Sequence, residues 1–226
     1  MRSNNPRSET TSKERILKKI RKALLEKHDN PYLNLEETAL YPKLEDPLEF
    51  VFAQQFAAVA GKFVYCEDDI DLIENLLALA ERDSLRKIYA WEPEVQKVLG
   101  TYGFPFYSTD TDFEQAEVGI TSCEALIARN GSILISNANA AGRRLSIYPH
   151  IHIVIAYTSQ LLADIKDGLE LMKTKYGEDL PSMISLITGP SRTADIEKTL
   201  VLGAHGPREL YVFLMDDSIM PPSSGE

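Results

Sequence analysis

The sequence predicts an α/β fold, with an open, mostly parallel sheet, helices on both faces and an N-terminal helical extension. Between residues 46 and 99, stretches with helical spacing of apolar residues alternate with short extended stretches, as in a parallel sheet joined by helices. After residue 110 the extended stretches are continuously apolar, which is typical of buried central strands. The 226 residues, 44% of them hydrophobic, can bury the core of one large domain.

The elements of the first half begin and end at clear local signals. Thr11 and Glu14 have capping-box spacing before apolar residues at helical intervals, so a first helix is predicted from Thr11 to about Lys27. Pro47 suits a first helical position and Gly61 a helix end, so a second helix is predicted between them. The pattern then predicts a strand at 62–67, a helix at 69–82, a strand at 87–91 and a helix at 92–99.

The second half is predicted to be rich in strands. They are expected at 117–120, 131–136, 151–157, 183–188 and 209–215, with a helix near 159–176. Polar and proline-containing ends predict poorly ordered tails. The expected organisation is a tail at 1–10, a helix and connector at 11–44, one α/β domain at 45–216, and a tail at 217–226.

Composition disfavours several classes of protein. Two cysteines, Cys66 and Cys123, lack C-x-x-C spacing, so no structural zinc, iron–sulfur cluster or other cofactor is expected in this chain. The net charge of −10 disfavours a nucleic-acid footprint. No apolar leader and no run of about 20 apolar residues is evident, so a cytoplasmic protein is expected. The usual nucleotide-binding, hydrolase and zinc-protease motifs are absent from the sequence.

The first predicted helix differs in charge from the rest of the chain. Seven basic residues and two acidic residues lie between Lys13 and Lys27, although the whole chain is acidic. Such a helix is either a solvated face or a docking element for an acidic partner or a membrane surface.

Three loops that follow predicted strands are candidates for a binding site. In open α/β sheets ligands bind beyond the carboxyl ends of the strands. The loops begin at Thr121, Asn137 and Gly189, and they collect small residues, hydroxyls and arginines. Small residues let backbone N–H groups approach a ligand, and a guanidinium can grip a carboxylate or phosphate, so a small anionic metabolite is predicted. A purely structural turn, with Ser191 or Thr193 capping a short helix, is the alternative.

Titratable residues near these loops are candidates for chemistry. Glu124 is a possible acid or base, and His205, in a turn before the last strand, could bind a ligand or carry a proton. His150 and His152 lack an evident third ligand, so no metal site is predicted. The candidate catalytic residues are Glu124 and His205, and the candidate ligand-binding residues are Thr121, Asn137, Arg144, Gly189, Ser191, Arg192, Thr193, Asp195 and Gly206. Arg144, Arg192 and His205 are expected to meet around one ligand.

Several of these segments resemble a known family over nearly the whole chain. The segments are Gly119-Ile120-Thr121, Ile127-Ala128-x-x-Gly131-Ser132, Arg144-Leu145-x-x-x-x-Pro149, Gly189-Pro190-Ser191-Arg192-Thr193-Ala194-Asp195-Ile196-Glu197 and Gly203-x-His205-Gly206-Pro207. In order and spacing they resemble the LUD-domain family of lactate utilization protein C, or LutC/YkgG-type, proteins.

The resemblance implies a fold like that of the NagB/RpiA/CoA-transferase group. It also implies a subunit that takes part in the oxidation of L-lactate to pyruvate, beside partner subunits that carry iron–sulfur clusters. The chain departs from the family pattern at Arg129 and Asn130, where an acidic residue and a hydroxyl are usual. A guanidinium is no covalent nucleophile, so chemistry of the CoA-transferase type is not expected.

Two other functions are compatible with the sequence. One is a stand-alone enzyme of the sugar-phosphate isomerase or acyl-transfer type, with Glu124 or His205 as proton carrier. The other is a non-catalytic assembly module with a degenerate pocket, which docks through its basic first helix.

Overall fold

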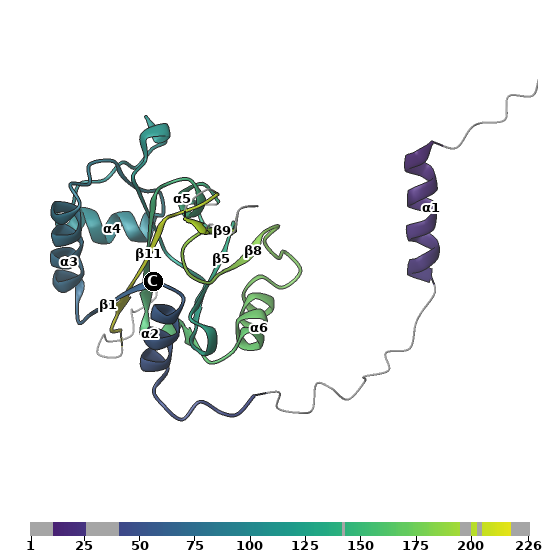
Figure 1. Cartoon of the computed structure of the whole chain (residues 1–226), viewed down its shortest axis with the longest axis horizontal. Helices are drawn as coiled ribbons and strands as arrows, with labels where there is room; N and C mark the ends of the chain where they lie inside the picture. The colour runs from purple at the N-terminus through teal and green to yellow at the C-terminus, as the bar shows by residue number, and fades with distance from the viewer. Residues whose placement is uncertain (1–10, 26–40, 142, 195–199, 203–204, 218–226) are drawn as a thin grey trace, which may run out of the picture. The chain divides into compact units, whose positions relative to one another are not determined.

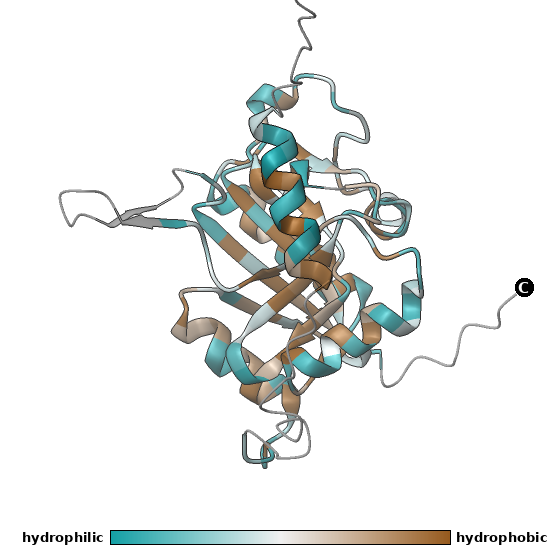
Figure 2. Ribbon diagram, turned by 90° about the vertical axis from the view of Figure 1, so that its right-hand side faces the viewer, coloured by the Kyte–Doolittle hydropathy of each residue, from teal (hydrophilic) through white to brown (hydrophobic). Residues whose placement is uncertain are grey.

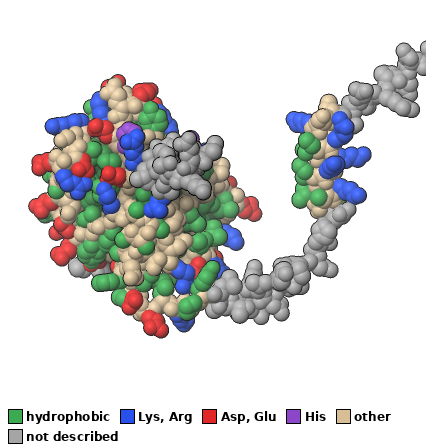
Figure 3. Space-filling model, in the orientation of Figure 1, with side chains coloured by type: hydrophobic (Ala, Val, Ile, Leu, Met, Phe, Trp, Pro, Cys, Tyr) green, Lys and Arg blue, Asp and Glu red, His purple; other side chains and the backbone are tan. Residues whose placement is uncertain are grey.

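The chain divides into two compact units, Met1–Lys43 and Leu44–Glu226. The computed structural model describes residues 11–25, 41–141, 143–194, 200–202 and 205–217. In the first unit, helix α1 (Ser12–Leu25) begins with the predicted capping box, because the Thr11 backbone N–H donates to Glu14 Oε2 at 2.8 Å. Figure 3 shows Lys and Arg side chains along one side of α1 and apolar side chains along the other. Most of the predicted tails and connector, at 1–10, 26–40 and 218–226, lie outside the described residues.

The centre of the second unit is an all-parallel sheet, which confirms the predicted α/β class. In its described part the strand order is β1-β11-β6-β3-β2. The strands are β1 (Lys62–Cys66), β2 (Ile88–Ala90), β3 (Val118–Thr121), β6 (Ile151–Tyr157) and β11 (Glu209–Met215). Strands β6 and β11 have the predicted bounds, because each is a continuous apolar run between turns.

Helices α3 (Asp69–Arg82) and α4 (Pro93–Thr101) cover one face of this sheet (Figure 1). Asp68 caps α3 by accepting the Asp71 backbone N–H at 2.8 Å. The apolar stripe of α3, with Leu72 and Leu76, packs with Phe213 and its neighbours in one core cluster. Figure 2 shows hydrophobic residues concentrated on the strands and polar residues on the outer sides of the helices.

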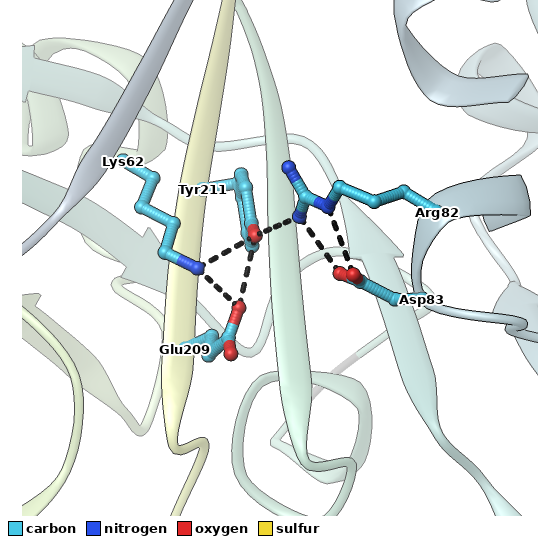
Figure 4. Close-up of polar contacts among 5 residues, drawn as sticks. All are labelled: Lys62, Arg82, Asp83, Glu209 and Tyr211. Atoms are coloured by element: carbon cyan, nitrogen blue, oxygen red, sulfur yellow. Dashed lines mark hydrogen bonds and ion pairs between the residues drawn. The ribbon is translucent and has the colours of Figure 1, made fainter. Parts of the chain in front are cut away.

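A polar network fastens the end of α3 to the neighbouring strands β1 and β11 (Figure 4). Arg82 makes two hydrogen bonds to Asp83, each 2.8 Å long, and donates to the Tyr211 hydroxyl at 3.1 Å. Lys62 Nζ donates to Glu209 Oε2 at 2.6 Å and to the same tyrosine hydroxyl at 2.8 Å. Tyr211 therefore joins a helix and two strands at this edge.

A second sheet covers the opposite face, and the sequence did not predict it. Its described strands follow the order β7-β4-β5-β8, with β4 and β5 antiparallel. They are β4 (Ala125–Ile127), β5 (Ser132–Ser136), β7 (Leu161–Leu162) and β8 (Ile184–Ile187). The stretches 131–136 and 183–188 are strands as predicted, but they belong to this sheet. Strand β5 is apolar on both faces because it is buried between the parallel sheet and a helix, so its pattern matches that of a central strand.

Two further helices complete the layers. Helix α2 (Leu48–Ala58) places Phe52 and Phe56 in the core between the two sheets. Helix α6 (Ile165–Tyr176) covers the outer face of the second sheet through Met172 (Figure 1). Gly131 has φ +60°, and a Cβ there would lie 2.4 Å from the Phe56 backbone nitrogen, so the close approach of α2 to the β4–β5 turn requires glycine.

The remaining described elements are short. They are α5 (Arg144–Ile147), the 3-10 turns η2 (Phe113–Gln115), η3 (Ala128–Asn130) and η4 (Thr158–Gln160), and the antiparallel pair β9 (Arg192–Ala194) and β10 (Leu200–Leu202). The alternative prediction of a helix capped by Ser191 is wrong, because β9 begins at Arg192. Extended backbone there pairs with β10 instead of starting a helical turn. A helix capped by Thr193 would run through 195–199, which lie outside the described residues.

Candidate functional site

A pocket of about 210 Å³ lies between the two sheets. The first residues of β6 and β11 form one wall, and β5 and β8 form the other. Its lining is mainly apolar, with hydroxyls and imidazoles as the polar groups: Ile135, Ser146, Ile147, His152, Met183, Ser185, Ile187, Gly189, Pro190, Ser191, His205, Gly206, Pro207 and Leu210. This position is at the amino ends of β6 and β11, where the sequence predicted no site. The predicted loop 189–191, which follows the carboxyl end of β8, does line the pocket.

Two loops that are distant in sequence meet at the rim of this pocket. The Ser191 backbone N–H donates to the Pro207 carbonyl at 2.8 Å. A Cβ on Gly206 would lie 3.1 Å from Ser191 Cβ, so the loops are in close contact. Gly189 has φ +82°, and a Cβ there would lie 2.3 Å from the Val59 carbonyl oxygen. Both glycines therefore serve the packing of the loops that form the pocket.

His152 is the buried polar residue of the pocket wall. Its side chain is fully buried, and its Nε2 lies 2.9 Å from the Thr121 hydroxyl on the neighbouring strand β3. Nδ1 has no hydrogen-bond partner among the described residues. Burial lowers the pKa of His152 to about 3, so the ring is neutral near pH 7.

A small polar cleft adjoins the pocket and shares Ile135 and Ser146 with it. The cleft contains Glu92, which is buried and accepts the Ser122 backbone N–H at 2.6 Å. Burial raises the pKa of Glu92, and the hydrogen bond from Ser122 partly opposes this. Thr121 also lines the cleft, so its contact with His152 joins the two cavities.

Glu124 lines neither cavity and has a full set of partners. Its carboxylate accepts hydrogen bonds from Ser136 Oγ at 2.6 Å, Lys175 Nζ at 2.8 Å and the Tyr176 hydroxyl at 2.8 Å. Burial alone would raise the pKa of Glu124, but these three donors outweigh it and hold the pKa below its ordinary value. The contacts join β5 to the end of α6, and they account for the burial of this carboxylate without a ligand.

The two predicted arginines have partners outside the pocket. The Arg144 guanidinium lies over the rings of Trp91 and Phe113, at 5.2 and 4.6 Å from their centroids, and 3.3 Å from Asp110. Arg192 Nη2 donates to the Val59 carbonyl at 2.6 Å. Of the three side chains expected to meet around one ligand, only His205 lines this pocket.

The other predicted residues divide between structural contacts and positions that are not described. Asn137 donates to Ser182 Oγ at 2.8 Å and accepts the Met183 backbone N–H at 3.0 Å, so it bridges the ends of β5 and β8. Gly189, Ser191 and Gly206 line the pocket. The Thr193 side chain and Asp195 lie outside the described residues.

Sequence reasoning did not select several residues of the two cavities. His152 was considered only as a metal ligand, although a single polar residue inside the apolar run 151–157 indicates a special role. Glu92 had no comparable signal, because an acidic residue before a helix is common on protein surfaces. Among the described residues, no group of three or more His, Cys, Asp or Glu side chains could hold a metal ion.

Comparison with known proteins identifies a known domain in the second half of the chain. Residues 107–215 match the model of the LUD domain. This part of the chain is a LUD domain. Its match to Lactate utilization protein C of Shouchella clausii is 38% identical over 105 residues, 46% of each chain. A protein of the same name from Bacillus velezensis is 29% identical over 168 residues, 70% of each chain.

Two further comparisons extend this LUD-domain assignment. The Uncharacterized protein YkgG of Escherichia coli is 36% identical over 106 residues, 46% of each chain. The chain thus spans about half the length of most of the curated relatives that it matches. A crystal structure of a DUF162 family protein from Deinococcus radiodurans shares the fold, with TM-score 0.57, 18% identity and coverage of 77% of this chain and 99% of that one. In the described part of this LUD-domain protein, no helix is long and apolar enough to cross a membrane.

Proposed function

We propose that this LUD-domain protein binds a small organic acid, of the size of lactate or pyruvate, in the pocket between its sheets, and that it acts in lactate utilization. One observation supports this most directly. The loop at 189–191 and the turn at 205–207, which carry the most specific family motifs, line the same pocket. Relatives that match parts of this chain are named Lactate utilization protein C.

The chemistry of the lining suits a small acid with an apolar end. Ser185 and Ser191 offer hydroxyl donors for carboxylate oxygens, and His205 adds an imidazole. Ile187 and Leu210 offer an apolar surface for a methyl group. Arg192 and Thr193 come next in the same loop but are not among the described residues that line the pocket. Mutation is therefore needed to test whether they take part in binding.

The protein is proposed to be a non-redox subunit, with electron transfer carried by iron–sulfur partner subunits. Both cysteines, Cys66 and Cys123, are buried. Burial raises the pKa of Cys66 to about 12 and also raises the pKa of Cys123, so both thiols stay protonated and are poor metal ligands. An assay of L-lactate oxidation should therefore need the partner subunits, and turnover by the purified chain alone would contradict this role.

Binding is tested by calorimetry and thermal shift with L-lactate, pyruvate, acetate and sulfate at one ionic strength. Ser185→Phe should fill the pocket and abolish binding of the organic acid. Leu186→Phe is the matched control, because neighbouring residues of a strand point to opposite faces and Leu186 lies outside the pocket lining. If neither lactate nor pyruvate binds the wild-type chain, or if Ser185→Phe leaves binding intact, the proposal is wrong.

A further inference from the structure

We propose that His152 makes the pocket select 2-hydroxy acids over 2-oxo acids, because its free ring nitrogen accepts a hydrogen bond that only the hydroxyl of the ligand can donate. The inference rests on the proposed function and adds the chemical class of the preferred ligand. It comes from a buried contact between β6 and β3 at the wall of the pocket.

The first step is the assignment of the proton on the His152 ring. The Thr121 hydroxyl has one hydrogen, and it donates to the Ser122 carbonyl oxygen at 2.9 Å. The same hydroxyl lies 2.9 Å from His152 Nε2, and it has only lone pairs left for this contact. Nε2 must therefore carry the hydrogen and donate to Thr121. In a neutral imidazole the other nitrogen, Nδ1, then has no hydrogen and is an acceptor.

The second step is that this acceptor lacks a partner. Nδ1 is buried and makes no hydrogen bond to any described residue. Buried polar atoms are satisfied in the great majority of proteins, because an unmade hydrogen bond costs about 1–3 kcal/mol. His152 is one of the residues that line the pocket, so a ligand there can supply the missing donor once a small movement of the buried ring brings Nδ1 within its reach.

The third step is the chemistry of the ligand. A 2-hydroxy acid presents one O–H beside its carboxylate, and this group can donate to Nδ1 while the carboxylate contacts the serine hydroxyls. A 2-oxo acid presents a carbonyl oxygen at the same position. Two acceptors would then face each other in a buried site, and neither would be satisfied. One neutral hydrogen bond with its desolvation penalty corresponds to a preference of about tenfold or more.

The experiment compares the dissociation constants of L-lactate and pyruvate for the wild-type chain and two variants. His152→Gln keeps an N–H that can reach Thr121 but removes the acceptor at Nδ1, so the ratio should fall from about tenfold to near one. His152→Asn places an amide oxygen near the position of Nδ1, so the preference for lactate should persist. Loss of the preference in both variants, or in neither, would overturn the proposal.

A second variant and a spectroscopic measurement keep the test independent of folding. Thr121→Val removes the acceptor for the Nε2 hydrogen and should weaken the preference, whereas Thr121→Ser should restore it. Nitrogen-15 NMR of labelled histidine in the free wild-type protein should show one neutral tautomer with the proton on Nε2. A proton on Nδ1 would overturn the inference without any ligand.

The two proposals fail in different ways. Equal affinity for lactate and pyruvate would leave the pocket function intact and would overturn only the role of His152. Absence of binding by both acids would overturn the proposed function and this inference with it.

Discussion

Two buried titratable residues, Glu124 and His152, lie close to the predicted site but have opposite environments. Glu124 accepts hydrogen bonds from three side chains on β5 and α6. His152 has one partner on Nε2 and none among the described residues on Nδ1. Burial alone therefore does not identify a binding residue. What distinguishes the two is whether the protein itself completes their hydrogen bonds.

The pKa directions report the same difference. Burial would raise the pKa of Glu124, but its donors stabilise the carboxylate and the net effect is a lowered value. Burial is the only cause acting on His152, and it lowers the pKa to about 3. A complete set of hydrogen-bond donors therefore keeps Glu124 charged, whereas burial without such partners keeps His152 neutral.

The largest expected effect is on stability, and it comes from removing the Glu124 carboxylate together with its three hydrogen bonds. Glu124→Ala should lower the free energy of unfolding by about 3 kcal/mol, because it leaves two hydroxyls unpaired and a small cavity. The affinity for L-lactate should change less than about twofold in protein that stays folded. Urea unfolding and calorimetry measure the two quantities. A variant with normal stability and no lactate binding would give Glu124 the functional role and reverse the comparison.

The next effect concerns pH and His152. The folded pKa lies below the ordinary histidine value of 6.5, so the unfolded chain binds the proton first as the pH falls. Stability that is present above pH 6.5 is therefore lost on acidification, by about 2 kcal/mol between pH 7 and pH 5. Urea unfolding at pH 7 and pH 5 measures this loss of unfolding free energy. The loss should be about 2 kcal/mol smaller in His152→Gln than in the wild-type protein. Parallel pH dependence of the two proteins would mean that the folded protein can protonate His152 easily.

A smaller effect is expected from Lys175→Met. The side chain of Lys175 is 51% exposed, so solvent screens its ion pair with Glu124 and the loss of stability should be about 1 kcal/mol. Lys173→Met is the matched control, because it removes the same charge from the same helical turn. Equal melting temperatures for the two variants would show that the two hydroxyl donors alone are enough to hold the carboxylate.

The smallest effect separates two neighbours in the rim loop. Ser191→Ala should weaken L-lactate binding roughly fivefold by removing one hydroxyl of the lining. Arg192→Ala should change it less than about twofold, because its guanidinium donates to the Val59 carbonyl. If titration calorimetry finds the larger loss in Arg192→Ala, the guanidinium reaches the ligand after all, as the sequence alone predicted.

The sequence was informative where the signal is local. The strands 151–157 and 209–215 were predicted because a continuous apolar run of this length between two turns is typical of a buried strand. The loop at 189–191 and the turn at 205–207 stood out through glycines, and they do line one pocket. A family resemblance added the link between them that spacing could not provide.

The sequence was uninformative where long side chains or whole layers choose among partners. Arg144 could reach a ligand or an aromatic cluster, and only the tertiary structure places it over Trp91 and Phe113. The pattern of β5 is the same whether a helix or another sheet covers it, so the second sheet was missed. His152 depends on a hydroxyl 31 positions earlier in the chain, and no local pattern reports that contact.

The position of the pocket at the seam between two sheets has a mechanical consequence. A ligand bound there contacts β6 and β11 on one side and β5 and β8 on the other. It therefore links two layers that otherwise meet through apolar packing. Any motion that separates the two layers must first release the ligand, so binding opposes that motion. Slower amide hydrogen exchange should consequently spread to both layers at once upon occupancy, rather than stay confined to the loops at the rim.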